Sequence, residues 1–208
     1  MKINLKNQKE NYTDRGELSL DYLSNKDILA MNLCLLKLIR EVNPFCNREL
    51  YLRYLHTRYL FILQAHNAYM SHQMQSCMRN LEIRMYPSFL EKDIADLTGS
   101  YPTPKGNDHL MSSELDNATA LGWILVSEAI ASFSPHFLEK AQIIGFHETY
   151  GARHLAGTAA LFNSRWRQTC IHANAMIRDG VAVDELQAAI SRILRHLQML
   201  AEKELKNG

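Results

Sequence analysis

Apolar residues recur at helical spacing through most of the chain, and no segment alternates apolar and polar residues for long enough to predict a strand. The pattern predicts helices over about 24–42, 47 to the mid-70s, 87–97, 113–144, 159–178 and 184–205. Their number and unequal lengths favour an all-α fold, an irregular helical bundle. We expect residues 1–17 to form a flexible N-terminal arm and residues 18–208 to form a single helical domain.

Prolines mark several helix ends. Pro44 should end the first helix, because the residue before a proline disfavours the helical conformation. Pro87 suits the first turn of a helix, and Pro135 should kink the long central helix, where it removes a backbone donor. Side chains at other ends can cap helices, and the expected caps are Ser24, Ser113 and Asp184, with a further helix start near Asn47.

Composition narrows the classes of function. With 208 residues and 47% hydrophobic content, the chain can bury one sizeable core. Its 23 basic and 22 acidic residues are well mixed, which argues against binding to nucleic acid or to an anionic membrane. The four cysteines lack CxxC spacing, the N-terminus is polar and lacks the apolar core of a secretory signal, and no apolar run has the length of a membrane span. We therefore expect a cytoplasmic protein.

Four blocks carry a resemblance to a known family: NPFCNRELYLRYLHTRYLF, DIADLTGSYPTPKGND, ALGWILVSE and YGARHLAG. In this order and at these distances they resemble the bacterial heme oxygenases that produce biliverdin, over most of residues 24–170. The resemblance implies a heme oxygenase-like bundle with a kinked distal helix. It also implies heme as both substrate and cofactor, and a redox partner that supplies electrons.

The proximal position of that family is changed in this chain. Asn32 occupies the position that matches the family's iron-ligating histidine, and residues 1–55 contain no histidine. An amide is a far poorer iron ligand than an imidazole, and a buried asparagine with satisfied hydrogen bonds is the interpretation we favour. Met31 or Cys34 could replace it as axial ligand if the helix shifted by one residue.

The distal helix also differs from the family, at two positions where heme contact is implied. Ala129 and Phe133 stand where the resemblance implies glycines that let the helix approach heme. A benzyl group at Phe133 should fill space that a porphyrin would occupy. His136, on the same predicted face, is a candidate for an unorthodox axial ligand from the distal side.

Three polar residues match the family's contacts to heme propionates: Asn25, Arg40 and Lys140. Solvated surface charge is the explanation we favour for them. If they converge on one site, they predict a tetrapyrrole or another acidic small ligand.

A metal site is the next alternative, because the chain contains nine histidines. No repeated Glu-x-x-His motif is present, and His147, Glu148 and His154 are expected in a connecting loop, which is a poor metal cage. Further candidates are Glu128, His136 and His172. The basic residues Arg53 and Arg58 of the second helix are expected to face solvent.

Three functions follow from these patterns. The first is a heme oxygenase-like protein that has lost heme degradation and serves as a binding or interaction module. The second is an active heme oxygenase with a non-standard axial ligand, and the third is another oxidative enzyme on the same scaffold. The first helix is apolar on more than one face, which indicates either deep burial or a homodimer contact.

Overall fold

The computed structural model describes residues 37, 39–77, 87–103, 115–160 and 162–206. Within these ranges the chain is helical, and extended pairing is limited to isolated bridges from His147 to Tyr150 and Gly151. The predicted all-α class is confirmed. After a short helical segment at 39–42, the elements are α3 (Arg48–Met70), α4 (His72–Cys77), α5 (Pro87–Thr98), α6 (Asn117–Ala131), α7 (Ser134–Ile143), α8 (Arg153–Ala159), α9 (Phe162–Arg178), α10 (Val183–Ala201) and the wider turn η1 (Glu202–Lys206).

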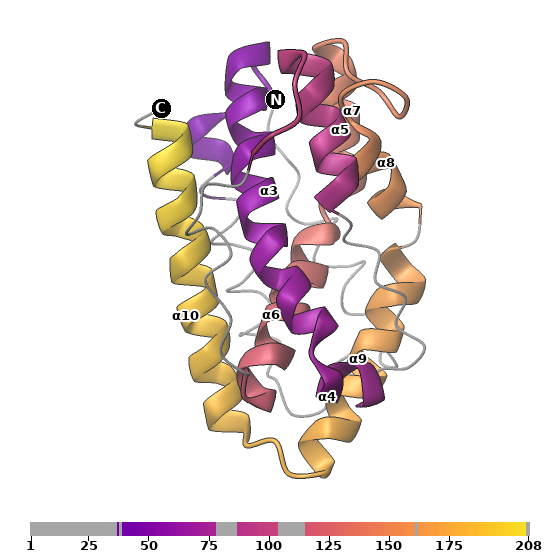
Figure 1. Cartoon of the computed structure of the whole chain (residues 1–208), viewed down its shortest axis with the longest axis vertical. Helices are drawn as coiled ribbons and strands as arrows, with labels where there is room; N and C mark the ends of the chain where they lie inside the picture. The colour runs from indigo at the N-terminus through magenta and orange to yellow at the C-terminus, as the bar shows by residue number, and fades with distance from the viewer. Residues whose placement is uncertain (1–36, 38, 78–86, 104–114, 161, 207–208) are drawn as a thin grey trace, which may run out of the picture.

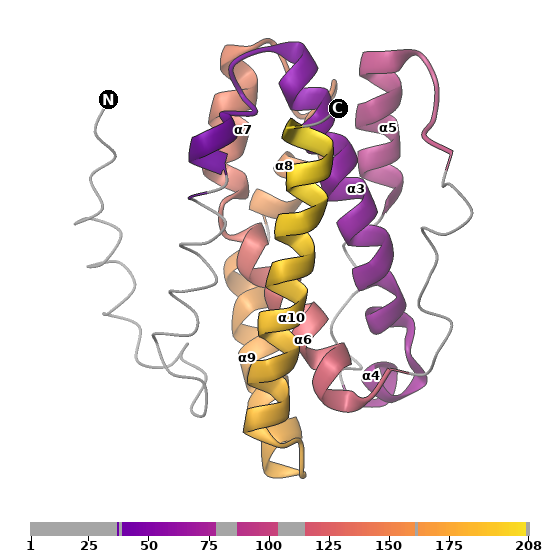
Figure 2. The same cartoon turned by 90° about the vertical axis from the view of Figure 1, so that its left-hand side faces the viewer.

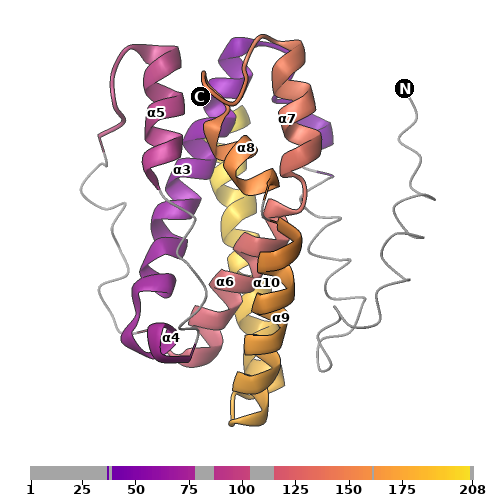
Figure 3. The same cartoon turned by 90° about the vertical axis from the view of Figure 1, so that its right-hand side faces the viewer.

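The long helices pack around α6. Helix α10 lies along α6, and α3 and α9 also pack on α6 (Figures 1 and 2). The short helix α8 lies between α5 and α7 at one end of the bundle (Figure 3). This arrangement places the turn between α7 and α8 next to the N-terminal half of α3.

Three helix ends follow the sequence signals. The Asn47 side chain accepts a hydrogen bond from the Leu50 N–H at 2.9 Å, so it caps α3 as expected. The preceding helix ends at Asn43, whose N–H donates to the Ile39 carbonyl and whose φ of 47° is left-handed. Pro87 lies in the first turn of α5, where a missing N–H costs nothing.

Other predicted boundaries are wrong. The helix from Asn47 stops at Met70, because the Ser71 hydroxyl donates to the Ala68 carbonyl and α4 starts afresh. Helix α6 is capped by Asp116, which accepts from the Thr119 N–H, and not by Ser113, a residue outside the described part of the chain. Helix α10 has Ala182 at its N-cap, so Asp184 lies within the first turn instead of capping it.

The predicted central helix is two helices bent by 47°. The break falls at Ser132 and Phe133, before the proline, and Pro135 occupies the first turn of α7. A proline in a first turn costs no hydrogen bond, so the helix restarts there instead of kinking around it. The predicted 159–178 helix is likewise preceded by a separate short helix, α8.

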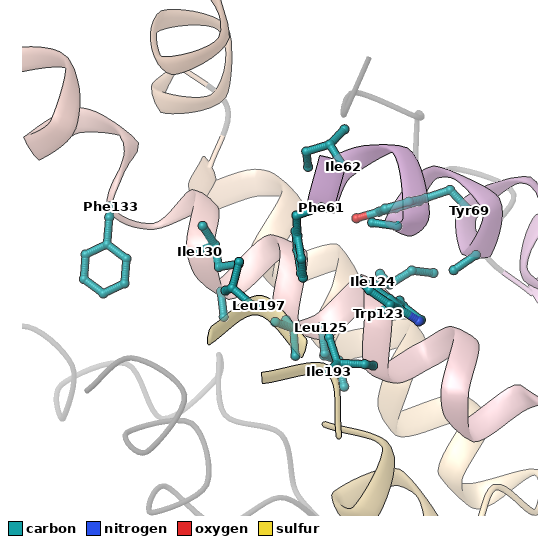
Figure 4. Close-up of a cluster of buried hydrophobic side chains, with 14 of the residues drawn as sticks. Phe61, Ile62, Tyr69, Trp123, Ile124, Leu125, Ile130, Phe133, Ile193 and Leu197 are labelled. Carbon is teal, nitrogen blue, oxygen red and sulfur yellow. The ribbon is translucent and has the colours of Figure 1, made fainter. Parts of the chain in front are cut away.

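The core forms on α6. Nearly every residue from Ala118 to Ala131 is buried, and the cluster in Figure 4 joins this helix to α3 and α10. Gly122 permits the close contact with α10, because a Cβ there would lie 3.1 Å from the Ile193 side chain. No single described helix has the length and apolar character to cross a membrane. The bent pair α6 and α7 meets that test only when the two are taken together.

Several predictions concern residues outside the described ranges. They are the 1–17 arm, the Ser24 cap, and the first-helix residues Asn25, Met31, Asn32 and Cys34.

Candidate functional site

The α6–α7 break contains the distal positions singled out in the sequence. Ala129 and Phe133 are both buried, and Phe133 is only 8% exposed. Its ring leaves the connection between the two helices, at the end of the cluster that runs through Ile130 and Leu125 (Figure 4). The Phe133 ring stacks on Phe137 with centroids 5.8 Å apart. The aromatic side chain at the distal position is therefore part of the packed interior.

Aromatic contacts continue from this break across the end of the bundle. Phe137 stacks on Phe45 at 5.2 Å, and Phe45 lies 5.2 Å from Tyr54 of α3. Tyr51 then stacks on Phe146 at 4.7 Å, in the turn after α7. Such pairs contribute about 0.5–1.5 kcal/mol each beyond the area they bury. Phe133 is thus held from one side by a connected set of rings.

The other predicted members of this face lie nearer the surface. The His136 side chain is 42% exposed, with Nδ1 4.0 Å from the Glu139 carboxylate. Partial burial, with Lys140 nearby, lowers the pKa of His136 below its usual value. Lys140 is partly exposed in the last turn of α7, and Arg40 is exposed before α3. Their predicted contact with an acidic ligand stays a prediction.

Glu128 forms a buried ion pair instead of a metal ligand set. Its carboxylate accepts hydrogen bonds from the Arg165 guanidinium, with Nε 3.2 Å from both oxygens, and from the Tyr69 hydroxyl at 2.8 Å. Burial, reinforced by the Glu128 charge, raises the pKa of Tyr69 well above its usual range. The pair ties α3, α6 and α9 together below the break. No group of three His, Cys, Asp or Glu side chains suited to a metal occurs in the described part of the chain.

His154 is the clearest departure from the sequence-based expectation. It lies at the start of α8 and not in a loop, and it is 7% exposed. Its Nδ1 lies 2.8 Å from Asp93 Oδ2, and its backbone N–H donates to the same oxygen at 3.0 Å. The other oxygen accepts from the Arg153 N–H and side chain at 3.0 and 3.2 Å. Asp93 thus caps α8 from a neighbouring helix.

The pKa shifts of Asp93 and His154 agree with this hydrogen bonding. Burial would raise the pKa of Asp93, but the bonds from His154 and Arg153 hold it below its usual value. Burial lowers the pKa of His154, and Asp93 only partly offsets that effect.

Arg153 also pairs with Asp96, and Asp96 accepts from the Gly151 N–H at 2.7 Å. Gly151 has φ 73°, and a Cβ there would lie 2.6 Å from the Phe146 ring.

Arg58 contradicts the prediction that it faces solvent. It is only 9% exposed, and its Nε and Nη1 atoms are buried without a hydrogen-bond partner. Arg53, by contrast, pairs with Glu49 at 2.7 Å nearer the surface. The sequence contained a signal for the burial of Arg58 and Asp93, because each interrupts an apolar stripe at helical spacing. The apolar neighbours of Arg58 are Leu55, Tyr59 and Ile62. Those of Asp93 are Leu90, Ile94 and Leu97.

No protein-family model matches the sequence. The sequence is 28% identical over 148 residues to heme oxygenase PigA of Pseudomonas aeruginosa, and the match covers 71% of each chain. The fold is similar to that of the NO- and CO-bound heme oxygenase from Neisseria meningitidis. That match has a TM-score of 0.74 and 21% identity, and it covers 87% of this chain and 89% of the other. The predicted resemblance is therefore confirmed, and the chain has the all-α heme oxygenase-like fold.

Proposed function

We propose that this protein does not degrade heme in the manner of its relatives and that it acts as a binding or interaction module on the heme oxygenase fold. The ligand we expect is a tetrapyrrole or another small acidic molecule, held by the polar residues that match propionate contacts. No protein side chain is assigned a catalytic role in this proposal.

The observation that supports the proposal most is the position of Phe133. The resemblance implies small residues where α6 gives way to α7, so that backbone can lie against a porphyrin. Here a benzyl side chain is buried at the break and stacked on Phe137. Packed interiors leave little room for a second occupant. Ala129, one turn earlier, adds a methyl group on the same stretch. These residues do not fit close approach of a heme to the distal helix.

Asn32, at the position that matches the family's iron-ligating histidine, would also weaken heme binding. An imidazole ligand contributes much of the affinity of a heme site, and an amide would not replace it. Loss of the ligand on one helix and filling of space on the other would weaken heme binding independently. The two changes together argue for loss of catalysis more strongly than either would alone.

An active heme oxygenase is the second candidate. It is favoured by the 28% identity to a protein named as a heme oxygenase and by His136, whose imidazole is partly accessible on α7. If His136 ligated the iron, its imidazole would occupy the side on which oxygen should bind. The iron would then be blocked, and turnover would be disfavoured. The third candidate, a different oxidative enzyme, has only the number of histidines in its favour.

One spectroscopic experiment separates these candidates. Hemin is added to the purified protein, the Soret band is recorded, and ascorbate or a reductase system is then supplied. We expect no conversion to biliverdin. Biliverdin absorbance growing from a sharp Soret complex would establish the second candidate and overturn the proposal. Iron found in the protein as isolated would favour the third.

A further inference from the structure

Arg58 is a buried cation with unfilled hydrogen-bonding capacity. A guanidinium stays protonated in proteins, and burying it without a partner is costly. Its Nε and Nη1 atoms have no hydrogen-bond partner, although the side chain is more than nine-tenths buried. The Asp93 carboxylate, which is bonded to His154, already accepts two hydrogen bonds on each oxygen. Asp93 therefore has no acceptor position left for Arg58.

A second unpaired buried atom, His154 Nε2, belongs to the same region. Asp93 is ionised and can only accept, so the proton of the His154 ring is on Nδ1 and Nε2 is left free. Tyr54 lies one turn before Arg58 on α3, and its ring centroid is 6.1 Å from that of His154. Arg58 is also close enough to lower the pKa of His154. The two unpaired groups thus lie on facing elements, α3 and α8.

The charges around them determine what can bind. Asp93 and Asp96 carry two negative charges, and Arg153 and Arg58 carry two positive ones. The set is neutral when His154 is neutral. With an anion bound, these groups and the anion sum to zero charge only if His154 takes up a proton. That proton would make Nε2 a second donor toward the anion. Asp93 from α5 and Arg58 from α3 are the charged groups that act on His154. Helix α7, which also packs on α8, places the uncharged Phe137 ring against Tyr54.

We propose that Arg58 and His154 form a buried site for a small carboxylate or oxyanion, which binds between α3 and α8 together with one proton. The Arg58 Nε and Nη1 atoms donate to the anion, and the proton taken from solvent resides on His154 Nε2. On release of the anion the proton returns to solvent. This site does not depend on the function proposed above, since none of its residues lies at the α6–α7 break.

The test uses sodium formate as the probe on the full-length protein. Formate binding is followed by calorimetry at pH 5.5 and pH 7.5, in two buffers with different ionisation enthalpies so that proton uptake can be counted. We expect saturable binding, uptake of up to one proton per formate at pH 7.5, and tighter binding at pH 5.5. Arg58→Met should weaken binding at least about tenfold, because it removes charge-assisted hydrogen bonds. Arg53→Met, on the same helix and paired at the surface with Glu49, should leave binding unchanged.

A readout on the native chain does not depend on whether Arg58→Met folds. The ¹⁵N signal of His154 Nε2 should move toward the protonated imidazole position as formate is added at constant pH. Binding that is not saturable, equal responses in the Arg58→Met and Arg53→Met variants, or an Nε2 signal that does not move would each overturn the proposal. The last result would mean that only water bridges the two groups.

Discussion

The α6–α7 break and the contact between α3 and α8 are both buried, but they differ in whether their buried polar atoms have hydrogen-bond partners. At the break, the Phe133 ring is packed on Phe137, and the Ser132 hydroxyl donates to the Ala129 carbonyl at 2.6 Å. At the other contact, Arg58 and His154 keep three buried nitrogen atoms without partners. The first region is filled where the family resemblance implies a ligand, and the second has unpaired buried nitrogen atoms on Arg58 and His154.

A third buried cluster shows that this difference is not a general property of the fold. Glu128 and Arg165 pair at several atoms, with Tyr69 as a further donor. There the chain completes its buried hydrogen bonds, as most buried polar groups do. Among the described residues, single buried atoms without a partner also occur at Ser127, Thr169 and His196, but Arg58 is the side chain of that set that carries a permanent charge. Its unpaired atoms therefore call for an explanation.

The largest expected effect comes from emptying the break. Phe133→Ala should lower the free energy of unfolding by about 3–5 kcal/mol, because a buried aromatic ring is lost and a cavity remains. The measurement is urea unfolding followed by circular dichroism. His136→Ala, three residues on and partly exposed, is the matched control and should cost much less. Equal losses in the two variants would mean that Phe133 does not belong to the core.

The next effect comes from weakening the paired part of the polar contact. Asp93→Asn should cost about 2–3 kcal/mol, because an amide oxygen cannot replace a carboxylate that accepts four hydrogen bonds from Arg153 and His154. The same urea experiment measures this change. Glu139→Asn, at an exposed carboxylate on α7, is the control. An Asp93→Asn protein as stable as the native one would remove the assigned role of Asp93 in capping α8.

Acid should destabilise the protein in a way that depends partly on His154. Its pKa is lowered by burial, so the unfolded chain, with a histidine pKa near 6.5, binds the proton more readily. Stability is thus complete above about pH 6.5 and falls as the pH drops below that value. Urea midpoints at pH 7.5, 6.5 and 5.5, without carboxylate anions, should decrease in that order. The decrease should be smaller in His154→Gln. A midpoint that rises on acidification would contradict this sign.

The smallest effect, and the one with opposite sign, is expected for Arg58→Met. Methionine has a similar length and no charge, so the variant avoids the cost of an unpaired buried cation. In a buffer without carboxylates or oxyanions we expect it to be as stable as the native protein, or more stable by up to about 1 kcal/mol. A large loss of stability would show that the Arg58 guanidinium is paired in solution. That result would also remove the basis of the anion site.

The sequence predicts the parts of this fold that depend on neighbouring residues. Asn47 caps α3 and Pro87 opens α5 because these roles need only local chemistry. Ser113 and Asp116 both carry a capping oxygen, so pattern alone could not choose between them. Arg58 and Asp93 each interrupt an apolar stripe, but the pairing of Asp93 with His154 was beyond such reasoning, since it depends on α8. Asp93 and His154 are 61 residues apart in the chain, and only the folded bundle brings them together.

The hemin affinity of an Asn32→His, Phe133→Gly double variant tests the central claim most directly. If Phe133 fills the distal space and Asn32 replaces the iron ligand, removing both obstacles should tighten hemin binding at least about tenfold over the native protein. Phe133→Ala in the same Asn32→His background serves if glycine at the break prevents folding. A Soret titration gives the affinities, and circular dichroism checks that each variant is folded. Folded variants that bind hemin no better than the native protein would show that these two positions do not form a heme site.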